Sequence, residues 1–590
     1  MIYKSNIEQF SLKFKKAERL FNILSLSRLS LVLIIVVSLY FYTNNQELVY
    51  LLVFGLSIIS FAAIIYFHDK VGRKKNLLGS LLKLNQNELD YLNRVSIPFE
   101  NGIEFLPEHH PYSYDIDIVG QNSLFQHLNR CGTYPAKAKL AERLLNALDK
   151  EEILKNQEAI AELTPMIEFR QRLLAIANMK RDSKAHYDKI LAWTGIKNPS
   201  FSIVLRVLSF LLPLCFWILL GIYSFGIYNI DVNVLSYVFL LNLVLLYSQF
   251  KKIRIQIFQA DNVRNILSQY AAILSEIENT DFKTEKLKDL KHQLKSENFS
   301  AGKSLNKLAS LFSSLEAIQN LLGAVIFNGL FLYHLHVLYD LLQWKNKNAD
   351  KLKSWLDLIA EFETLNSFAN FSYNNPGFTF PEINTEKQYR FESLGHPLLD
   401  PLKRVDNDVD FSLRPFIVLT GSNMSGKSTF LRAIAVNLVL GATGSVVCAK
   451  KASFHPMPLF VSMRLSDSLA DSESYFYAEI KRLHEIMQYL ENGAAFVLLD
   501  EILRGTNSED KRNGTIGVLK KLIEYKAVGA IATHDLEVCN TIVEYPDYLS
   551  NQCFEVEIKN DNLFFDYKLK QGISQNKSAS FLMKKMQIIS

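Results

Sequence analysis

A run of twenty residues without a charged side chain, Leu48–Phe67, constrains this chain more than any other feature. A helix of that length crosses the roughly 30 Å hydrocarbon core of a bilayer. A shorter apolar run, Leu29–Tyr42, precedes it, and a second pair follows at Val207–Tyr228 and Val232–Phe250. Only a few residues join the members of each pair. The sequence therefore predicts two transmembrane helical hairpins, and the alternative is two pairs of buried core helices.

The placement of Lys and Arg favours the membrane interpretation. Cations flank the outer ends of both pairs, whereas the tight turns Thr43–Glu47 and Asn229–Asp231 contain none. Cytoplasmic segments of membrane proteins are enriched in Lys and Arg, so both termini are predicted to be cytoplasmic. The flanking cations are Lys13, Lys15, Lys16, Arg19, Arg28, Lys70, Arg73, Lys74, Lys75, Arg206, Lys251, Lys252 and Arg254. We expect an integral protein of a bacterial inner membrane, with the lipid bilayer as a partner.

A fifth apolar stretch, Leu321–Trp344, receives the opposite interpretation. It contains Asn328, His334, His336 and Asp340, and such polar side chains are costly at the centre of a bilayer. We therefore expect this stretch to form a buried helix of the soluble core.

Length and composition set the rest of the organisation. A chain of 590 residues is too long for one core, and its net charge of +5 is compatible with nucleic acid or anionic lipid without proving either. The five cysteines are scattered and show no metal-ligand spacing, so buried thiols are expected. The predicted regions are a first membrane hairpin at 1–75 (spans 29–43 and 48–67), a helical segment at 76–200, a second hairpin at 201–251 (spans 207–228 and 232–250), a helical segment at 252–380 and an α/β domain at 381–590.

A glycine-rich segment near residue 421 has the pattern of a phosphate-binding loop. The apolar run Pro415–Thr420 precedes GSNMSGKST, and a helical pattern follows, which gives strand, G-x-x-x-x-G-K-S, helix. The glycines permit backbone N–H groups to face phosphate oxygens, and the helix N-terminus adds positive charge. Lys427 is expected to reach the β- and γ-phosphates of ATP, and Ser428 to bind Mg²⁺. The predicted nucleotide-binding residues are Gly421, Ser422, Asn423, Met424, Ser425, Gly426, Lys427, Ser428 and Thr429.

Two further strand patterns end in side chains that suit phosphate chemistry. AAFVLLDE places Asp500 at a strand tip, where it would hold Mg²⁺, and Glu501 beside it, where it would position or deprotonate the attacking water. VGAIATHD places His534 after another strand, as a sensor of the γ-phosphate or as a purely structural residue. We therefore assign Glu501, Lys427 and His534 to catalysis, and Ser428 and Asp500 to the metal.

Four motifs resemble, in the same order, the ATPase motifs of the MutS family of DNA mismatch-repair proteins. They are TGSNMSGKSTFLR, MRLSDSLADSESYFYAEI, LLDEILRGTNSEDKRNG and ATHDLEV. GHPLL and YKLKQGISQNKSA resemble the flanks of that domain, and Gly120–Leu174 is weakly similar to the start of the family's helical core. The resemblance implies an α/β P-loop NTPase domain of ABC-like, MutS type behind an all-α core, with Ser425 where the family usually has glycine.

The resemblance also implies partners. Ser474, Phe476 and Glu479 match the signature segment whose serine reaches the nucleotide of the opposite subunit, so it implies a homodimer with two composite ATP sites. Ser474 as a simple helix N-cap is the alternative. DNA is the partner that the family implies. The family's N-terminal mismatch reader, with its wedging Phe and nearby Glu, has no counterpart before Gly120, and the second hairpin interrupts the helical core.

The sequence as a whole favours a membrane-anchored MutS-like ATPase in which ATP binding and hydrolysis drive a dimer conformational change, with DNA binding and a repair-related role. The alternative is a membrane-remodelling or transport-coupled ATPase that does not act on DNA. A non-enzymatic scaffold is disfavoured because Lys427, Ser428, Asp500 and Glu501 are all present.

Overall fold

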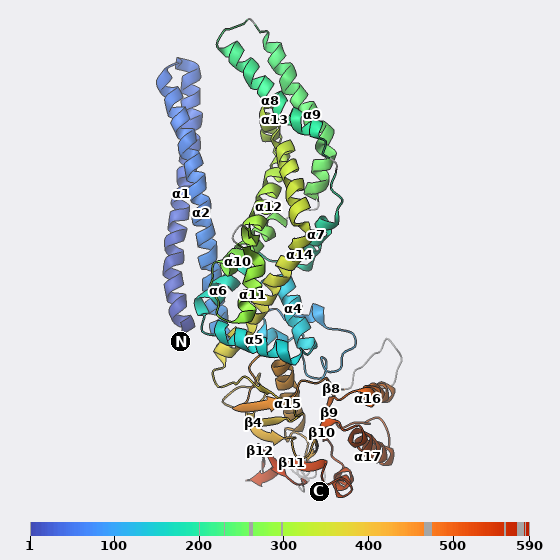
Figure 1. The fold of residues 1–590 in the computed structure, drawn as a ribbon. Coiled ribbons are helices and arrows are strands. Elements are labelled where there is room, and N and C mark those ends of the chain that lie inside the picture. Colours follow the sequence, from blue (N-terminus) through green and yellow to red (C-terminus); the bar gives the residue numbers. More distant parts are fainter. Residues whose placement is uncertain are drawn as a thin grey trace.

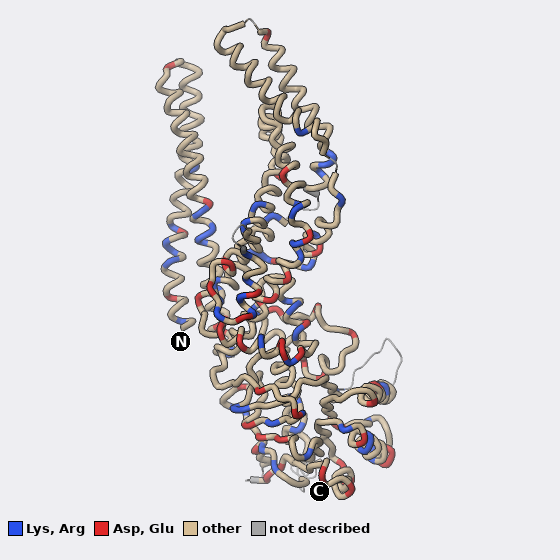
Figure 2. Tube along the Cα trace, in the orientation of Figure 1, with Lys and Arg blue, Asp and Glu red and all other residues tan. Residues whose placement is uncertain are grey.

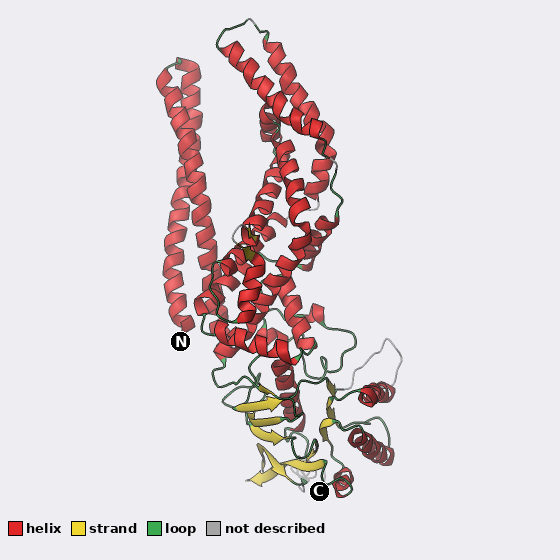
Figure 3. Ribbon diagram, viewed as in Figure 1, coloured by secondary structure: helices red, strands yellow, loops and turns green. Residues whose placement is uncertain are grey.

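Two helical hairpins project from one end of the molecule, and an α/β domain forms the other end, with a helical body between them (Figure 1). Most strands gather in the C-terminal domain, whereas the hairpins and the body are almost entirely helical (Figure 3). The structure is a computed structural model. It describes residues 2–199, 201–228, 230–258, 263–296, 299–464, 475–559, 562–574, 583 and 586–588.

The first hairpin consists of α1 (Ile2–Asn45) and α2 (Leu48–Leu92), which lie side by side along their length (Figure 1). Gly72 and Gly79 stand two turns apart on one face of α2. A Cβ at these glycines would lie 3.1 Å from the Phe21 ring and 3.2 Å from the Phe14 ring of α1. Two small residues therefore let the helices approach closely. At its base, the Tyr3 hydroxyl donates to Asn374 Oδ1 at 2.8 Å, which ties the hairpin to the helical body.

The second hairpin consists of α8 (Ile203–Ser224) and α9 (Val232–Phe258). Within the described residues, α1, α2, α8 and α9 are the four single helices long and apolar enough to cross a membrane. Figure 2 shows the Lys and Arg residues gathered toward the bases of both hairpins, and the sequence has none at 29–69 or 207–250. The helices extend beyond the apolar runs, because their polar continuations join the helical body.

The stretch Leu321–Trp344 does not form the single buried helix that the sequence predicts. It forms α13 (Leu321–Phe331) and the start of α14 (Tyr333–Asn374), with a break at Leu332, whose φ is +49°. The first turns of α14 are buried, but most of the large apolar side chains of α13 are exposed. The prediction was wrong for α13 because it treated each polar side chain as unpaired. In the structure, Asn328 and His334 hydrogen-bond to each other.

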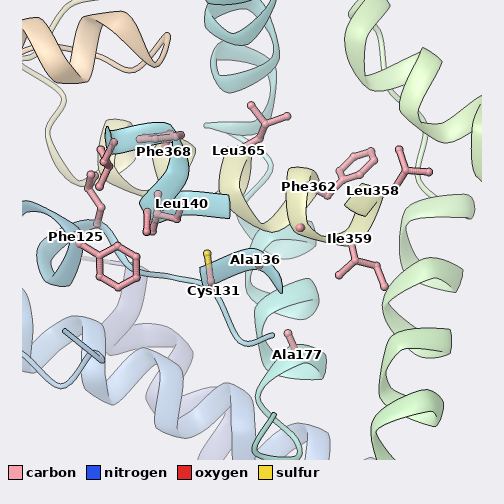
Figure 4. Packing of buried hydrophobic residues seen from close by; sticks show 14 of the residues in the cluster. Phe125, Cys131, Ala136, Leu140, Ala177, Leu358, Ile359, Phe362, Leu365 and Phe368 are labelled. Atoms are coloured by element: carbon pink, nitrogen blue, oxygen red, sulfur yellow. The ribbon is translucent and has the colours of Figure 1, made fainter. Parts of the chain in front are cut away.

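The helical body is organised around α14, which runs through it toward the α/β domain (Figure 1). Figure 4 shows Phe362 and Phe368 of this helix in the same buried cluster as Phe125 of α3 and Leu140 of α4. The buried Glu363 carboxylate accepts from the backbone N–H groups of Gly132 and Thr133, and burial raises its pKa to about 7. The other elements are η1 (Ile103–Phe105), α3 (Leu124–Leu128), α4 (Tyr134–Leu145), α5 (Lys150–Leu163), α6 (Ile167–Ala177), α7 (Lys184–Gly195), α10 (Val263–Glu278), α11 (Glu285–Leu294), β1 (Lys295–Ser296), β2 (Phe299–Ser300), α12 (Ala301–Glu316) and η2 (Ala317–Gln319).

Four of the five cysteines are buried, as the sequence predicts. Cys215 differs: it is exposed on α8, within the apolar run that is predicted to face lipid.

The C-terminal domain is built on a six-stranded sheet in the order β12-β11-β6-β10-β9-β8. All neighbouring pairs are parallel except β11 and β12. A second sheet has the order β3-β7-β4-β5. The three strands predicted from buried apolar runs are β6, β9 and β10, and every residue of each is buried. Because parallel strands end at one edge of a sheet, the residues that follow these strands meet there.

The bounds of these elements complete the fold. They are β3 (Glu382–Ile383), β4 (Arg390–Leu394), β5 (Asn407–Asp410), β6 (Phe416–Gly421), α15 (Lys427–Ala442), β7 (Lys451–Phe454), β8 (Leu459–Ser462), α16 (Tyr475–Asn492), β9 (Phe496–Asp500), α17 (Ser508–Glu524), β10 (Val528–Ala532), α18 (Leu536–Cys539), η3 (Asn540–Val543), β11 (Leu549–Lys559) and β12 (Asn562–Gln571).

Candidate functional site

The loop between β6 and α15 has a backbone that only particular residues allow. Gly421, Met424 and Gly426 have φ values of +149°, +67° and +105°. A Cβ at Gly421 would lie 2.7 Å from Ser425 Oγ and 2.8 Å from Phe554 O, so the chain needs glycine there. The loop turns the chain from the central strand into the N-terminus of α15, where unpaired backbone N–H groups favour an anion.

Lys427 lies across this loop. Its Nζ donates to Gly421 O at 2.8 Å and to Ser422 O at 3.1 Å, and it is 3.4 Å from His534 Nε2. The residue is 5% exposed, and burial lowers the pKa of its ammonium group. A cation held by carbonyl groups at the mouth of the loop is placed to bind phosphate.

Ser428 and Asp500 meet at the edge of the sheet. Ser428 Oγ donates to Asp500 Oδ2 at 2.5 Å. The other carboxylate oxygen, Asp500 Oδ1, is buried and has no hydrogen-bond partner. The same holds for Ser422 Oγ and Ser425 Oγ in the loop. Buried polar atoms are rarely left unpaired, and oxygen donors are those that Mg²⁺ prefers. The residues present therefore fit a magnesium–nucleotide complex.

Glu501 and His534 are in direct contact, with 2.5 Å between Glu501 Oε1 and His534 Nε2. Hydrogen bonding from His534, opposed by burial, lowers the pKa of Glu501 to about 2. Glu501 has a φ of +51°, and its N–H donates to Ala532 O at 3.0 Å. The backbone bond between the ends of β9 and β10 helps to hold this unusual conformation, which sets the carboxylate beside His534.

The segment after Glu501 is held by α16. The Glu479 carboxylate accepts from the backbone N–H groups of Leu503 at 2.8 Å and Arg504 at 3.2 Å. A Cβ at Gly505 would lie 2.9 Å from Phe476 Cβ, so the two residues pack closely. Phe476 and Glu479, which the sequence singled out, thus position the loop that follows the candidate catalytic carboxylate. The third residue of that motif, Ser474, lies outside the described residues.

The loop opens onto a pocket of about 390 Å³ that also contains residues to which sequence reasoning gave no role. Tyr567 is the clearest of them, since its ring lies 3.1 Å from where a Cβ at Gly426 would stand. Asn407 Nδ2 donates to Tyr567 O at 3.0 Å and helps to fix this residue, whose φ is +51°. His396 also lines the pocket. Both belong to segments noticed in the sequence, GHPLL and YKLKQG, but only their positions in the fold indicate what they contact.

A second unpredicted feature joins the α/β domain to the loop before α3. Asp115 is fully buried: its Oδ1 accepts from the N–H groups of Met463 at 2.7 Å and Arg464 at 2.9 Å, and its Oδ2 from Arg482 at 2.6 Å. The Arg464 guanidinium binds both carboxylate oxygens of Asp117, at 2.5 and 2.6 Å. Residues 464 and 482 flank the predicted signature segment, so two carboxylates hold both sides of its base.

Fold and site together define an α/β domain in which a glycine-rich loop, a lysine and three acidic or imidazole side chains converge at the edge of a parallel sheet. Residues 417–588 match the family model described as MutS domain V. This C-terminal part of the chain is therefore similar to the MutS family.

Similar proteins include MutS protein homolog 4 of Homo sapiens, which is 30% identical over 256 residues, 42% of this chain and 25% of that protein. The DNA mismatch repair protein MutS of Finegoldia magna is 31% identical over 238 residues, 38% of this chain and 27% of that protein. That of Ehrlichia chaffeensis is 32% identical over 234 residues, 39% of this chain and 29% of that protein. The chain thus spans about a quarter of the length of the curated relatives that it matches.

Proposed function

We propose that this protein is a membrane-anchored, ATP-hydrolysing member of the MutS family with a P-loop NTPase domain. The observation that carries the proposal is the convergence of Lys427, Ser428, Asp500, Glu501 and His534 from three strand ends. Buried oxygens without partners stand in the same place. A structural core would pair or exclude such atoms, whereas a nucleotide site keeps them for its ligand.

Each residue has a role that follows from its position. Lys427 and the N-terminus of α15 bind the β- and γ-phosphates, while Ser428 and Asp500 hold Mg²⁺, which neutralises phosphate charge when bound. Glu501 remains ionised at neutral pH because of its low pKa, so its carboxylate is available to orient the attacking water and to accept its proton. His534 touches both Glu501 and Lys427, so it is placed to respond to the γ-phosphate. We assign Tyr567 to the base of the nucleotide, because it lines the same pocket beside the loop.

The proposal includes a homodimer with composite ATP sites, in which Ser474 reaches the partner's nucleotide. Two features support it: Phe476 and Glu479 join the start of α16 to the loop after Glu501, and Asp115 and Asp117 brace the segment that leads to it. A movement at the partner subunit's ATP site would therefore displace the loop that follows the Glu501 carboxylate.

The proposal also includes a bilayer around the two hairpins and a cytoplasmic ATPase domain. α14 supplies a mechanical link between these ends. Near its beginning, His336 lies 3.1 Å from both Ser209 O and Arg206 Nη1 of α8. Just after its end, Thr379 pairs with Val447, close behind α15. Closing the ATP site would thus be transmitted along α14 to the second hairpin.

The first hairpin meets the same helix through a buried polar junction. Glu88 of α2 accepts from Arg130 Nε at 2.5 Å and from two asparagines of α14, Asn370 at 3.2 Å and Asn374 at 3.1 Å. Arg130 and Glu88 are both almost fully buried, and breaking one partner of such a pair is strongly unfavourable. Both hairpins are therefore coupled to one helix, which favours a function exerted on or through the membrane.

DNA is the partner proposed from the relatives, two of which are named DNA mismatch repair protein MutS. A membrane-remodelling or transport-coupled ATPase is the second candidate, and the link through α14 favours it. The decisive experiment measures ATP turnover of the nanodisc-embedded protein with homoduplex, mismatched or branched DNA, or none, with Lys427→Ala as the blank. Stimulation by DNA supports the first candidate. Turnover that depends on lipid composition but not on DNA supports the second.

A further inference from the structure

Helix α13 exposes an apolar face that would be unfavourable in water. The residues between Glu316 and Tyr333 carry no charged side chain. Leu321, Leu322, Ile326 and Phe327 are 75%, 77%, 51% and 55% exposed. With the partly exposed Val325 they form a continuous surface, which we call the α13 outer face. An exposed apolar patch of this kind marks a contact with hydrocarbon or with another protein.

The opposite side of α13 packs on the second hairpin. Gly329 lies directly against Phe239 of α9, because a Cβ at this glycine would lie 2.0 Å from the ring. Asn242 Nδ2 of α9 donates to Gly329 O at 2.7 Å. The rings of Phe331 and Trp217 of α8 have centroids 5.5 Å apart. The contacts of α13 on α8 and α9 are thus made well inside the two apolar runs, not at their charged ends.

Two polar residues of this region, Asn328 and His334, are buried and hydrogen-bond to each other. Asn328 is fully buried, and its Nδ2 lies 2.7 Å from His334 Nδ1. The backbone N–H of His334 donates to Asn328 Oδ1 at 2.9 Å. Polar groups that are paired inside a helix bundle cost far less in a bilayer than groups facing lipid. Of the four polar residues that argued against membrane contact, only Asn328 lies on α13, and its side chain faces away from the α13 outer face.

We propose that α13 lies inside the bilayer as a re-entrant half-span, with the α13 outer face in contact with acyl chains. The inference rests on the proposed membrane anchoring. Eleven residues of helix extend about 16 Å, roughly half of the hydrocarbon thickness. The axis bends by 109° between α12 and α13, and the chain turns again at Leu332. The chain therefore enters and leaves the bilayer on the same side, and the number of membrane crossings stays at four.

Continuity with α8 and α9 identifies lipid as the occupant. Those helices also expose large apolar side chains, such as Phe210 (54%), Leu214 (56%) and Val244 (63%). Figure 1 shows α13 alongside α8 and α9, at a height that the first hairpin also reaches. One hydrocarbon layer can therefore cover all these surfaces together.

Site-specific fluorescence in nanodiscs tests the location of α13. All five cysteines lie in the part of the chain that the structure describes, and Cys215 is the only exposed one among them, so Cys215→Ser supplies a background in which one added cysteine is labelled. The environment-sensitive label is placed at Ile326→Cys, and at two exposed control positions: Leu211→Cys on α8 and Asn306→Cys on α12. We expect nitroxides on the acyl chains to quench positions 326 and 211 at least threefold more than position 306, and iodide to show the reverse order.

The other outcomes distinguish a failure of the α13 half-span from a failure of the membrane anchoring on which it rests. Lipid quenching at 211 with iodide quenching at 326 leaves the anchoring intact and overturns the half-span. Quenching of 326 by neither agent also overturns it, since a second copy of the chain would then cover the face. An absence of lipid quenching at 211 removes the membrane anchoring and the inference with it.

Substitution by a charged residue gives an independent test, because its effect on stability has opposite signs for a face in water and a face in hydrocarbon. Ile326→Asp improves the solvation of an exposed face in water but is unfavourable in hydrocarbon. All four tryptophans lie in the helical half of the chain, so their fluorescence follows unfolding there. We expect the unfolding midpoint in nanodiscs to fall by at least about 3 °C for Ile326→Asp. The matched control Leu154→Asp, at a 40% exposed leucine of α5, should change it by less than about 1 °C. An unchanged midpoint for Ile326→Asp overturns the proposal.

Discussion

Replacement of Glu501 by glutamine should separate ATP binding from hydrolysis. Glutamine has nearly the same shape, can still hydrogen-bond to His534, and leaves Lys427 and Ser428 in place. We therefore expect the dissociation constant for ATP to change by less than about threefold. The amide carries no charge and cannot accept a proton, and removing a positioned base typically costs 10²- to 10⁴-fold in rate.

The pKa of Glu501 sets the size and the pH dependence of this effect. The carboxylate is ionised in the folded protein because its pKa is lowered to about 2. A lowered pKa means that the charged form of Glu501, and the stability that its hydrogen bond from His534 contributes, is present above the ordinary pKa near 4.5 and is lost as pH falls through about 2. Glu501 therefore contributes no change in turnover between pH 5 and 9, and the loss in Glu501→Gln should be uniform across this range.

The assay is phosphate release by the nanodisc-embedded protein, with nucleotide affinity measured by titration of a fluorescent ATP analogue. Glu509→Gln, at an exposed glutamate in the first turn of α17, is the matched control and should hydrolyse ATP at the normal rate. Turnover by Glu501→Gln above about a tenth of normal would refute the role given to this carboxylate. A loss that appears only at low pH would refute the argument from its pKa.

Further predictions address binding, coupling, topology and DNA. Lys427→Ala should weaken ATP binding at least about 100-fold in the same titration, because two or more charge-assisted hydrogen bonds are lost; near-normal affinity would contradict this. Asp115→Asn should leave ATP affinity within threefold but lower turnover at least tenfold, because an amide can accept on one side only, so either Arg482 or the backbone N–H groups at the base of the signature segment lose their acceptor; unchanged turnover would remove the positioning role. A cysteine at Asn45 should react with a membrane-impermeant reagent from outside the cell, and one at Lys75 should not; the reverse pattern would invert the topology. DNA affinity should fall with added salt and differ by less than about threefold between homoduplex and a single G·T mismatch, since phosphate contacts read no pairing fault; a tenfold preference in equilibrium titrations would reveal a mismatch reader.

The sequence alone was sufficient wherever a few neighbouring residues specify the structure. The loop between β6 and α15 is one contiguous motif whose glycines and lysine act through local backbone geometry. The apolar strands β9 and β10 place Asp500, Glu501 and His534 at predictable ends. The four long apolar helices follow equally directly, because the free energy of transferring an uncharged twenty-residue run depends on composition and length.

Only the tertiary structure decided which distant residues meet. The contacts of Asp115 with Met463 and Arg482, and of Tyr567 with the loop between β6 and α15, join segments more than 130 residues apart, and no local pattern encodes such a pairing. The same reason explains the error at α13. Whether a buried polar group is costly depends on its partner, and the Asn328–His334 pair exists only after the break at Leu332 brings the two side chains together.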